Sequence, residues 1–248
     1  SLEFDLMRIN DFLSPFLSAG FYYKTFMWPK TFWESLYEPL IRAAAGLGKL
    51  DKKSDPSVYD KGFLHCDLLI IGAGPAGLIS AYEAANNGLR VVLCDEDFLF
   101  GGRLNSDEER IEGYSSTAWI DKKVIELKKM KNVRLLNRTT VYGAFDHGIF
   151  GALEVKDYTG QFENKKPRQV LWRIYAKQSL LCSGATERSL LFGNNDRPGI
   201  MLSKSVRQYC NRWGVIPGKN ISIYTNNDDG WITARDLKDA GCNIVTVI

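Results

Sequence analysis

The chain has 248 residues, of which 45% are hydrophobic and 25% are charged, and its formal net charge is +3. These values are typical of an ordinary globular protein, and the small positive charge gives no reason to expect a nucleic-acid partner. No apolar run approaches the ~18 residues of a membrane-spanning helix. The start, Ser1–Asp5, lacks both an initiator methionine and a signal-peptide pattern. We therefore expect a cytoplasmic protein and a piece of a longer chain.

The five cysteines are widely spaced and form no Cys-x-x-Cys pair. This spacing favours free thiols in a reducing compartment over a disulfide framework or a metal site. The two histidines, His65 and His147, are isolated from each other in the sequence, which gives little support to a histidine-based catalytic group. The cysteines are Cys66, Cys94, Cys182, Cys210 and Cys242.

Residues 1–64 form a predicted leader and linker. The first 48 residues are rich in aromatic side chains, and Thr31–Ala45 is predicted to be a helix, with Thr31 and Glu34 as a capping box. We expect this helix to dock on the main domain or on a partner, and a ligand-stacking role for the aromatic residues is the alternative. The polar residues 49–64 are predicted to be a linker.

The stretch His65–Leu78 has the pattern of a buried strand, a glycine turn and the start of a helix. Gly72 permits the tight turn, Gly74 lets a pyrophosphate approach the backbone, and Gly77 lets the helix pack on the strand. Proline suits the first helical turn, whose free N–H groups attract phosphate. A purely structural turn is the alternative. The residues predicted to bind a dinucleotide here are Gly72, Gly74, Pro75, Ala76 and Gly77.

Acidic residues follow the next predicted strand, Arg90–Cys94. Asp95 lies where a carboxylate would bind an adenosine ribose, which favours NAD or FAD over NADP. Glu96 shares this role or is merely solvated. Gly101 and Gly102 then suit a loop folding over the cofactor, and Arg103 is predicted to pair with a phosphate, unless it is an exposed side chain in a turn.

A nucleotide-binding domain over residues 65–214 is predicted to continue with a helix, Ser116–Met130, and a parallel strand, Val133–Leu136. The backbone near Val141 is placed to run beside an adenine. Residues 141–177 alternate like an antiparallel β-meander. A separate strand, 179–185, then ends in a turn whose Gly184 allows close approach to the cofactor.

A second unit is predicted over residues 215–248, following a helix at Ser203–Trp213. It has a strand, a helix and a strand, but Asp228 and Asp229 stand where glycines would bind phosphate. These carboxylates would cap the helix and repel a pyrophosphate. We therefore expect a degenerate, incomplete unit without ordinary dinucleotide binding. The predicted fold is α/β: a Rossmann-like FAD/NAD(P)-binding domain with a parallel sheet and an inserted meander.

The order of these parts resembles that of flavoproteins with two dinucleotide-binding domains. Five stretches make the resemblance narrower, because they are similar to the α subunits of heterotetrameric sarcosine oxidases. They are Ala19–Pro29, His65–Asp67, Asp95–Glu96, Asn194–Gly199 and Tyr224–Asp229. By matching positions, the resemblance implies NAD contacts at Gly72, Gly74, Ala76, Gly77, Asp95, Glu96, Arg103 and Val141.

The resemblance also implies an activity and a set of partners. The family oxidatively demethylates sarcosine, passing the one-carbon unit to tetrahydrofolate and electrons to oxygen. It implies NAD in this domain, FAD in the β subunit, FMN between the α and β subunits, and γ and δ subunits in the complex. The folate site and most of the FMN site would fall outside this sequence.

Two other readings are open. One is an FAD-binding subunit of a heteromeric amino-acid, proline or opine dehydrogenase. The other is a nucleotide-stabilised scaffold that docks a catalytic partner. The sequence shows no acid–base constellation near the glycine turn, so we expect no catalytic residue in this chain and chemistry on another subunit.

Overall fold

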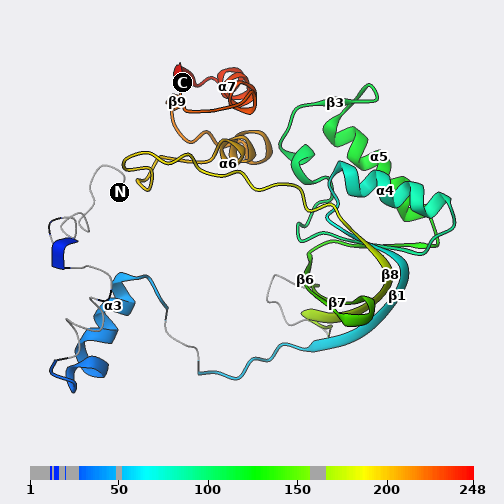
Figure 1. Ribbon diagram of the computed structural model, residues 1–248, viewed down its shortest axis with the longest axis horizontal. Coiled ribbons are helices and arrows are strands. Elements are labelled where there is room, and N and C mark those ends of the chain that lie inside the picture. The colour runs from blue at the N-terminus through cyan, green and yellow to red at the C-terminus, as the bar shows by residue number, and fades with distance from the viewer. Residues whose placement is uncertain (1–11, 13, 17–19, 21–27, 49–51, 157–165) are drawn as a thin grey trace. The chain divides into compact units, whose positions relative to one another are not determined.

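The computed structural model describes residues 12, 14–16, 20, 28–48, 52–156 and 166–248 (Figure 1). The chain divides into two compact units, residues 1–55 and 56–248. Most of the stretch Ala19–Pro29, at residues 19 and 21–27, and residues 157–165 of the predicted meander lie outside the described residues.

The first unit contains a short 3₁₀ turn, η2 (Ser14–Phe16), a π-helical turn, η3 (Trp33–Tyr37), and helix α3 (Glu38–Ala44). The predicted cap was wrong, since Phe32 precedes η3 without any side-chain cap hydrogen bond. Thr31 instead accepts a hydrogen bond at its carbonyl oxygen from Ser35 Oγ, at 3.3 Å. Docking of this helix on the main domain or on a partner stays a prediction.

The second unit is built on a six-stranded sheet in the order β5-β2-β1-β8-β7-β6. The pairings among β5, β2, β1 and β8 are parallel, whereas β8-β7 and β7-β6 are antiparallel. This topology confirms the predicted α/β fold with a parallel sheet and an attached meander. The strands are β1 (Tyr59–Ile71), β2 (Val91–Cys94), β5 (Val133–Leu136), β6 (Thr139–Phe145), β7 (Ile149–Val155) and β8 (Gln169–Leu181).

Two strands are longer than the sequence predicts. β1 begins at Tyr59, inside the predicted linker, and β8 is one strand of 13 residues instead of two separate segments. The register explains both differences, since Tyr59 pairs with Gln169 and Ile71 with Leu181 along a continuous parallel ladder. Cross-strand hydrogen bonding of this kind overrides the polar composition of the segments.

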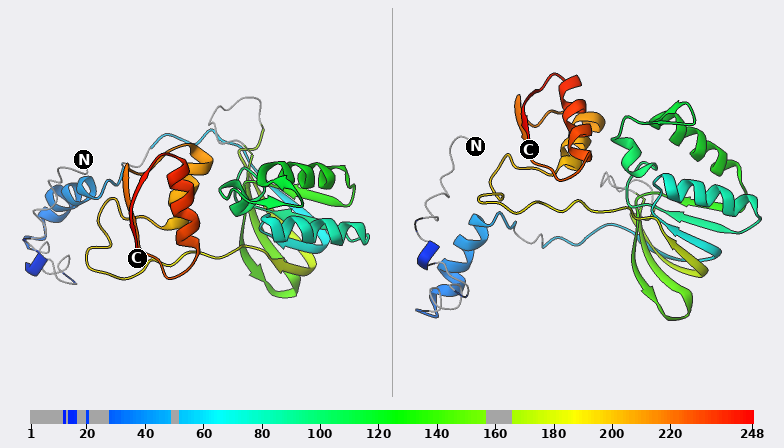
Figure 2. Two further views of the ribbon diagram at one scale, coloured as in Figure 1. Left: turned by 90° about the horizontal axis from the view of Figure 1, so that it is seen from above. Right: turned by 45° about the horizontal axis from the view of Figure 1, so that its top comes forward.

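Helices α4 (Pro75–Asn86) and α5 (Ser116–Lys129) pack on one face of the parallel part of the sheet (Figure 2). Successive side chains of β1 and β2 pack on opposite faces of the sheet, as expected for strands that are buried on both sides. Ile70 and Leu93 pack with the fully buried Trp119 of α5. Leu69 and Val92 belong instead to the core on the opposite face, which the meander completes.

Short elements complete this region: η4 (Gly102–Asn105), the two-residue strands β3 (Arg110–Ile111) and β4 (Tyr114–Ser115), and η5 (Asp146–Gly148). The remaining elements follow the long loop after β8. They are α6 (Ser203–Arg207), the π-helical turn η7 (Gln208–Arg212), β9 (Asn220–Ile223), α7 (Asp229–Asp239) and β10 (Asn243–Val247). β9 and β10 pair in parallel, as predicted. None of the described helices has the length and apolar character needed to cross a membrane.

The expected capping of α7 by its aspartates was wrong. Asp228 occupies the cap position without a side-chain cap hydrogen bond. Asn227 takes this role, because its Oδ1 accepts a hydrogen bond from the N–H of Asp229 at 3.0 Å. The carboxylate of Asp229 binds Arg207 Nη2 at 2.8 and 2.9 Å. A neighbouring guanidinium therefore balances the negative charge at this helix start.

Candidate dinucleotide-binding site

The turn between β1 and α4 excludes side chains at two positions. Gly72 has a φ of +101°, and a Cβ there would lie 2.4 Å from the carbonyl oxygen of Cys182. A Cβ on Gly77 would lie 2.0 Å from the carbonyl oxygen of Gly72. Glycine at both positions therefore lets the strand, the turn and the helix approach one another closely.

Gly74 differs from these two glycines, because a Cβ added there would meet no atom within 4 Å. It precedes Pro75 at the start of α4, where no side chain caps the helix. The first N–H groups of a helix lack intrahelical partners and carry partial positive charge. The loop over the turn is also close, since a Cβ on Gly102 would lie 2.9 Å from the Cα of Gly74. Open space beside an uncapped helix start fits a pyrophosphate.

Asp95 lies beside this turn, as the sequence predicts. Its Oδ2 accepts a hydrogen bond from the N–H of Ala73 at 2.6 Å, and its Oδ1 accepts one from the N–H of Asp97 at 2.8 Å. An ionised carboxylate has about four lone-pair sites, so two bonds leave it able to accept ribose hydroxyls. Glu96 is exposed, and its predicted part in ribose binding stays a prediction.

The other residues predicted to bind the cofactor lie near the glycine turn or Asp95 without contacting them in a way that reveals a role. Arg103 forms an ion pair with Asp107, and half of its side chain is exposed. Val141 lies two residues after Thr139, whose N–H donates to the carbonyl oxygen of Asp95 at 2.8 Å. Gly184 is exposed, with a φ of +72°, two residues beyond the Cys182 carbonyl that faces the glycine turn. Their cofactor contacts stay predictions.

Ion pairs join this site to the C-terminal helices, and no sequence motif indicates them. Arg212 binds Asp97 through two hydrogen bonds, which lower the pKa of Asp97 and raise that of Arg212. Arg207 lies between Asp107 and Asp229 with a side chain only 3% exposed. These partners are far apart in the sequence, so no local pattern would reveal them.

The surroundings of the cysteines and of His65 indicate packing roles. All five cysteines are free thiols, as predicted. Burial raises the pKa of Cys66 to about 11 and that of Cys94 to about 12. The ring of His65 stacks on Tyr175 with a centroid separation of 4.9 Å. Within the described ranges, no group of three or more potential metal ligands occurs.

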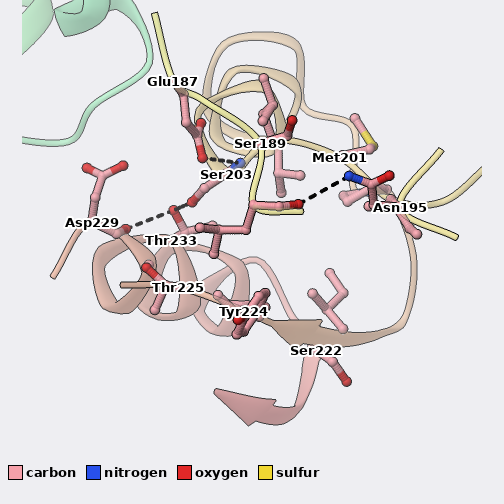
Figure 3. A pocket seen from close by; sticks show the side chains of 18 of the residues that line it. Glu187, Ser189, Asn195, Met201, Ser203, Ser222, Tyr224, Thr225, Asp229 and Thr233 are labelled. Atoms are coloured by element: carbon pink, nitrogen blue, oxygen red, sulfur yellow. Dashed lines mark hydrogen bonds between the residues drawn. The ribbon is translucent and has the colours of Figure 1, made fainter. Parts of the chain in front are cut away.

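A separate pocket of about 600 Å³ lies in the C-terminal part, between the loop 187–203, β9 and the start of α7. Figure 3 shows several of its polar groups bonded to one another. Ser203 Oγ lies 2.5 Å from Thr233 Oγ1, and Glu187 accepts hydrogen bonds from the backbone N–H groups of Ser203 and Lys204. All of its lining residues fall between 187 and 237, so this pocket is distinct from the glycine turn.

Comparison with known proteins agrees with this geometry. The family model described as FAD dependent oxidoreductase matches residues 67–127, which contain the glycine turn and Asp95. Sarcosine oxidase subunit alpha of Rhizobium meliloti (strain 1021) is 49% identical over 249 residues, covering 100% of this chain. The chain is a homologue of the sarcosine oxidase α subunits. This finding confirms the resemblance inferred from the sequence.

One further relative and one solved structure are also similar to this chain. Sarcosine oxidase subunit alpha of Corynebacterium sp. (strain P-1) is 42% identical, with 82% of this chain and 21% of that protein covered. The crystal structure of L-proline dehydrogenase from P. horikoshii matches with a TM-score of 0.62 and 25% identity, covering 80% of this chain and 37% of that chain. The chain spans 25% of the length of the Rhizobium α subunit.

Proposed function

We propose that this chain is the nucleotide-binding part of the α subunit of a sarcosine oxidase-like complex, and that it holds NAD at the glycine turn. The observation that carries the proposal is the juxtaposition of open space at Gly74 with the carboxylate of Asp95, which binds the neighbouring Ala73 N–H at 2.6 Å. The first feature suits a pyrophosphate and the second suits an unmodified adenosine ribose.

The chain's residues bind and orient the cofactor in this proposal. The N–H groups at the start of α4 would face the pyrophosphate, with Pro75 setting the backbone of the first turn. Asp95 would accept hydrogen bonds from the ribose. An NAD supplies a nicotinamide that can accept a hydride. The proposal assigns no proton-transfer or nucleophilic role to a residue of this chain, so the NAD acts as an anchor or auxiliary group.

The whole complex would oxidatively demethylate sarcosine and pass the one-carbon unit to tetrahydrofolate. FAD would lie in a β subunit and FMN between the α and β subunits, with γ and δ subunits completing a cytoplasmic complex. Homology to named α subunits supports this assignment. The test is turnover of sarcosine against L-proline by the complex purified with its partner subunits. Preferential sarcosine oxidation, with formation of the one-carbon tetrahydrofolate product, is the expected result.

A second candidate is a nucleotide- or FAD-binding subunit of a heteromeric proline, opine or amino-acid dehydrogenase. The fold similarity to L-proline dehydrogenase favours this reading. Turnover of L-proline in preference to sarcosine would support it and would contradict the first proposal.

The third candidate, a scaffold for the catalytic subunit, concerns the role of the nucleotide. It predicts that loss of the nucleotide, as in Asp95→Ala, weakens assembly of the complex. If assembly persists and turnover alone falls, the nucleotide acts in the reaction and the scaffold reading is wrong. Co-purification with the β subunit separates these outcomes.

A further inference from the structure

We propose that the helical segment Ser203–Arg212 (α6 with η7) is a positioning element of the dinucleotide site, and that Arg212 sets the ribose-binding carboxylate of Asp95 through Asp97. This inference rests on the proposed nucleotide binding. The segment contacts both loops that flank the glycine turn, one after β2 and one over the pyrophosphate position. Its side chains that make these contacts are Arg207, Asn211 and Arg212.

The first contact reaches the ribose-binding loop. Arg212 Nη1 donates to Asp97 Oδ2 at 2.6 Å, and Nη2 donates to Oδ1 at 2.8 Å. The Arg212 side chain is 8% exposed, and its guanidinium lies 4.8 Å from the ring centroid of Phe98. Paired hydrogen bonds to a planar carboxylate fix orientation as well as distance. The loop at Asp97 is thereby held in one position.

The backbone of Asp97 in turn orients the carboxylate of Asp95. The N–H of Asp97 donates to Asp95 Oδ1 at 2.8 Å, while Ala73 N–H holds Oδ2. Two donors from two loops therefore orient one carboxylate. One of the donors belongs to the residue that Arg212 clamps. A shift of the Asp97 loop would turn the Asp95 carboxylate away from the direction needed by the ribose hydroxyls.

The second contact reaches the loop over the pyrophosphate position. Asn211 Nδ2 donates to the carbonyl oxygen of Ser106 at 2.8 Å, and Arg207 Nη1 lies 3.6 Å from Asp107 Oδ1. The Arg207 and Asp107 side chains are 3% and 5% exposed. Asp107 also forms an ion pair with Arg103. Arg103 follows Gly102 in the sequence, and Gly102 packs on Gly74 of the glycine turn. The same helical segment therefore supports both halves of the site.

The measurement that separates positioning from general stabilisation is discrimination at the ribose. Bound nucleotide is first removed from the full chain, which is then titrated calorimetrically with ADP and with 2′-deoxy-ADP, in the wild type and in Arg212→Gln. The wild type is expected to bind ADP at least about tenfold more tightly, since a hydrogen bond to a charged group contributes that much. Arg212→Gln is expected to reduce this ratio to about twofold or less, because the loss falls mainly on ADP.

Arg235→Gln is the matched control. Arg235 lies in α7, with a side chain 63% exposed and a 3.5 Å ion pair to Asp236, and its replacement is expected to leave the ratio unchanged. Arg212→Lys keeps the charge but not the paired geometry, and is expected to give an intermediate ratio. It also replaces Arg212→Gln if that variant does not fold.

The outcomes are distinguishable. An unchanged ratio in a folded Arg212 variant would overturn the positioning inference, even if both affinities fell together. Failure of the wild type to bind ADP and NAD would overturn the proposed function and, with it, this inference. Wild-type binding without ribose discrimination would contradict the assignment of Asp95 and therefore the route from Arg212.

Discussion

Arg212 clamps the carboxylate of Asp97 with both terminal nitrogens, at 2.6 and 2.8 Å, across 115 residues of sequence. The contact joins the helical segment after the long loop to the segment that follows β2. Asp97 in turn donates its backbone N–H to Asp95. The surroundings of the predicted ribose-binding acid therefore depend on a residue from the other end of the chain.

This ion pair predicts a definite pH dependence of stability. Arg212 lowers the pKa of Asp97 in the folded chain, so the folded state binds this proton less readily than the unfolded state. The stabilisation is present above the ordinary aspartate pKa of about 3.9 and is lost as pH falls through the lower folded value. Asp97→Asn should lower the free energy of unfolding at pH 6 to 7, and the difference from wild type should shrink progressively as the pH falls below the ordinary aspartate pKa of about 3.9. A constant difference across this range, measured by urea unfolding, would contradict the assignment.

Replacing Asp95 tests the ribose contact. Asp95→Ala should weaken NAD binding by about 10-fold or more, because it removes a charged acceptor of hydrogen bonds. Glu96→Ala serves as the comparison, since Glu96 is the exposed neighbour. We expect the Glu96 variant to change the Kd less than the Asp95 variant. Equal losses in the two variants, measured by calorimetric titration after removal of bound nucleotide, would show that the ribose assignment is wrong.

Two glycines of the turn should respond differently to alanine. Gly77→Ala brings a Cβ to within 2.0 Å of the Gly72 carbonyl oxygen and is expected to cost about 1–3 kcal/mol of stability, as overpacking does. Gly74→Ala places its methyl group in open space, at a φ of −68° that alanine adopts readily. It should leave Tm nearly unchanged and weaken NAD binding by occupying the space of the pyrophosphate.

The comparison of these two variants separates packing from ligand approach. Thermal unfolding and NAD titration are measured on both. If Gly74→Ala binds NAD as tightly as wild type, the pyrophosphate does not approach this part of the turn. If Gly77→Ala is as stable as wild type, the close approach of strand and helix is not what requires glycine.

The buried thiols should resist modification. Burial raises the pKa of Cys66 to about 11 and of Cys94 to about 12, so the reactive thiolate is scarce at pH 8. Cys182 and Cys210 are only partly buried and should react first with a thiol reagent in the folded chain. Mass spectrometry of partly labelled protein checks this order. Early labelling of Cys94 would contradict the packing of β2.

The elements with strong local signals were predictable. Pro75 at a helix start, Asn87–Gly88 at its end and the apolar run of β2 define α4 and β2 within a residue or two. The position of Asp95 beside the glycine turn was likewise predictable, because it follows from spacing along one short segment. The cofactor contacts of these residues stay predictions.

The long-range contacts were not predictable. The continuous ladder between β1 and β8 depends on pairing between Tyr59 and Gln169, which are 110 residues apart. Asp229 appears from sequence to repel a pyrophosphate, but Arg207 neutralises it in the folded chain. Composition and periodicity describe a segment alone, whereas these features depend on which segments meet.

Binding of NAD at the glycine turn is tested most directly by the identity of the nucleotide that the protein carries. The chain is purified without partner subunits, denatured, and the released small molecules are identified by chromatography and mass spectrometry. The proposed function predicts NAD in an amount equal to the chain, with no absorption from a flavin. Release of FAD, or of no adenosine dinucleotide even after incubation with NAD, would contradict it.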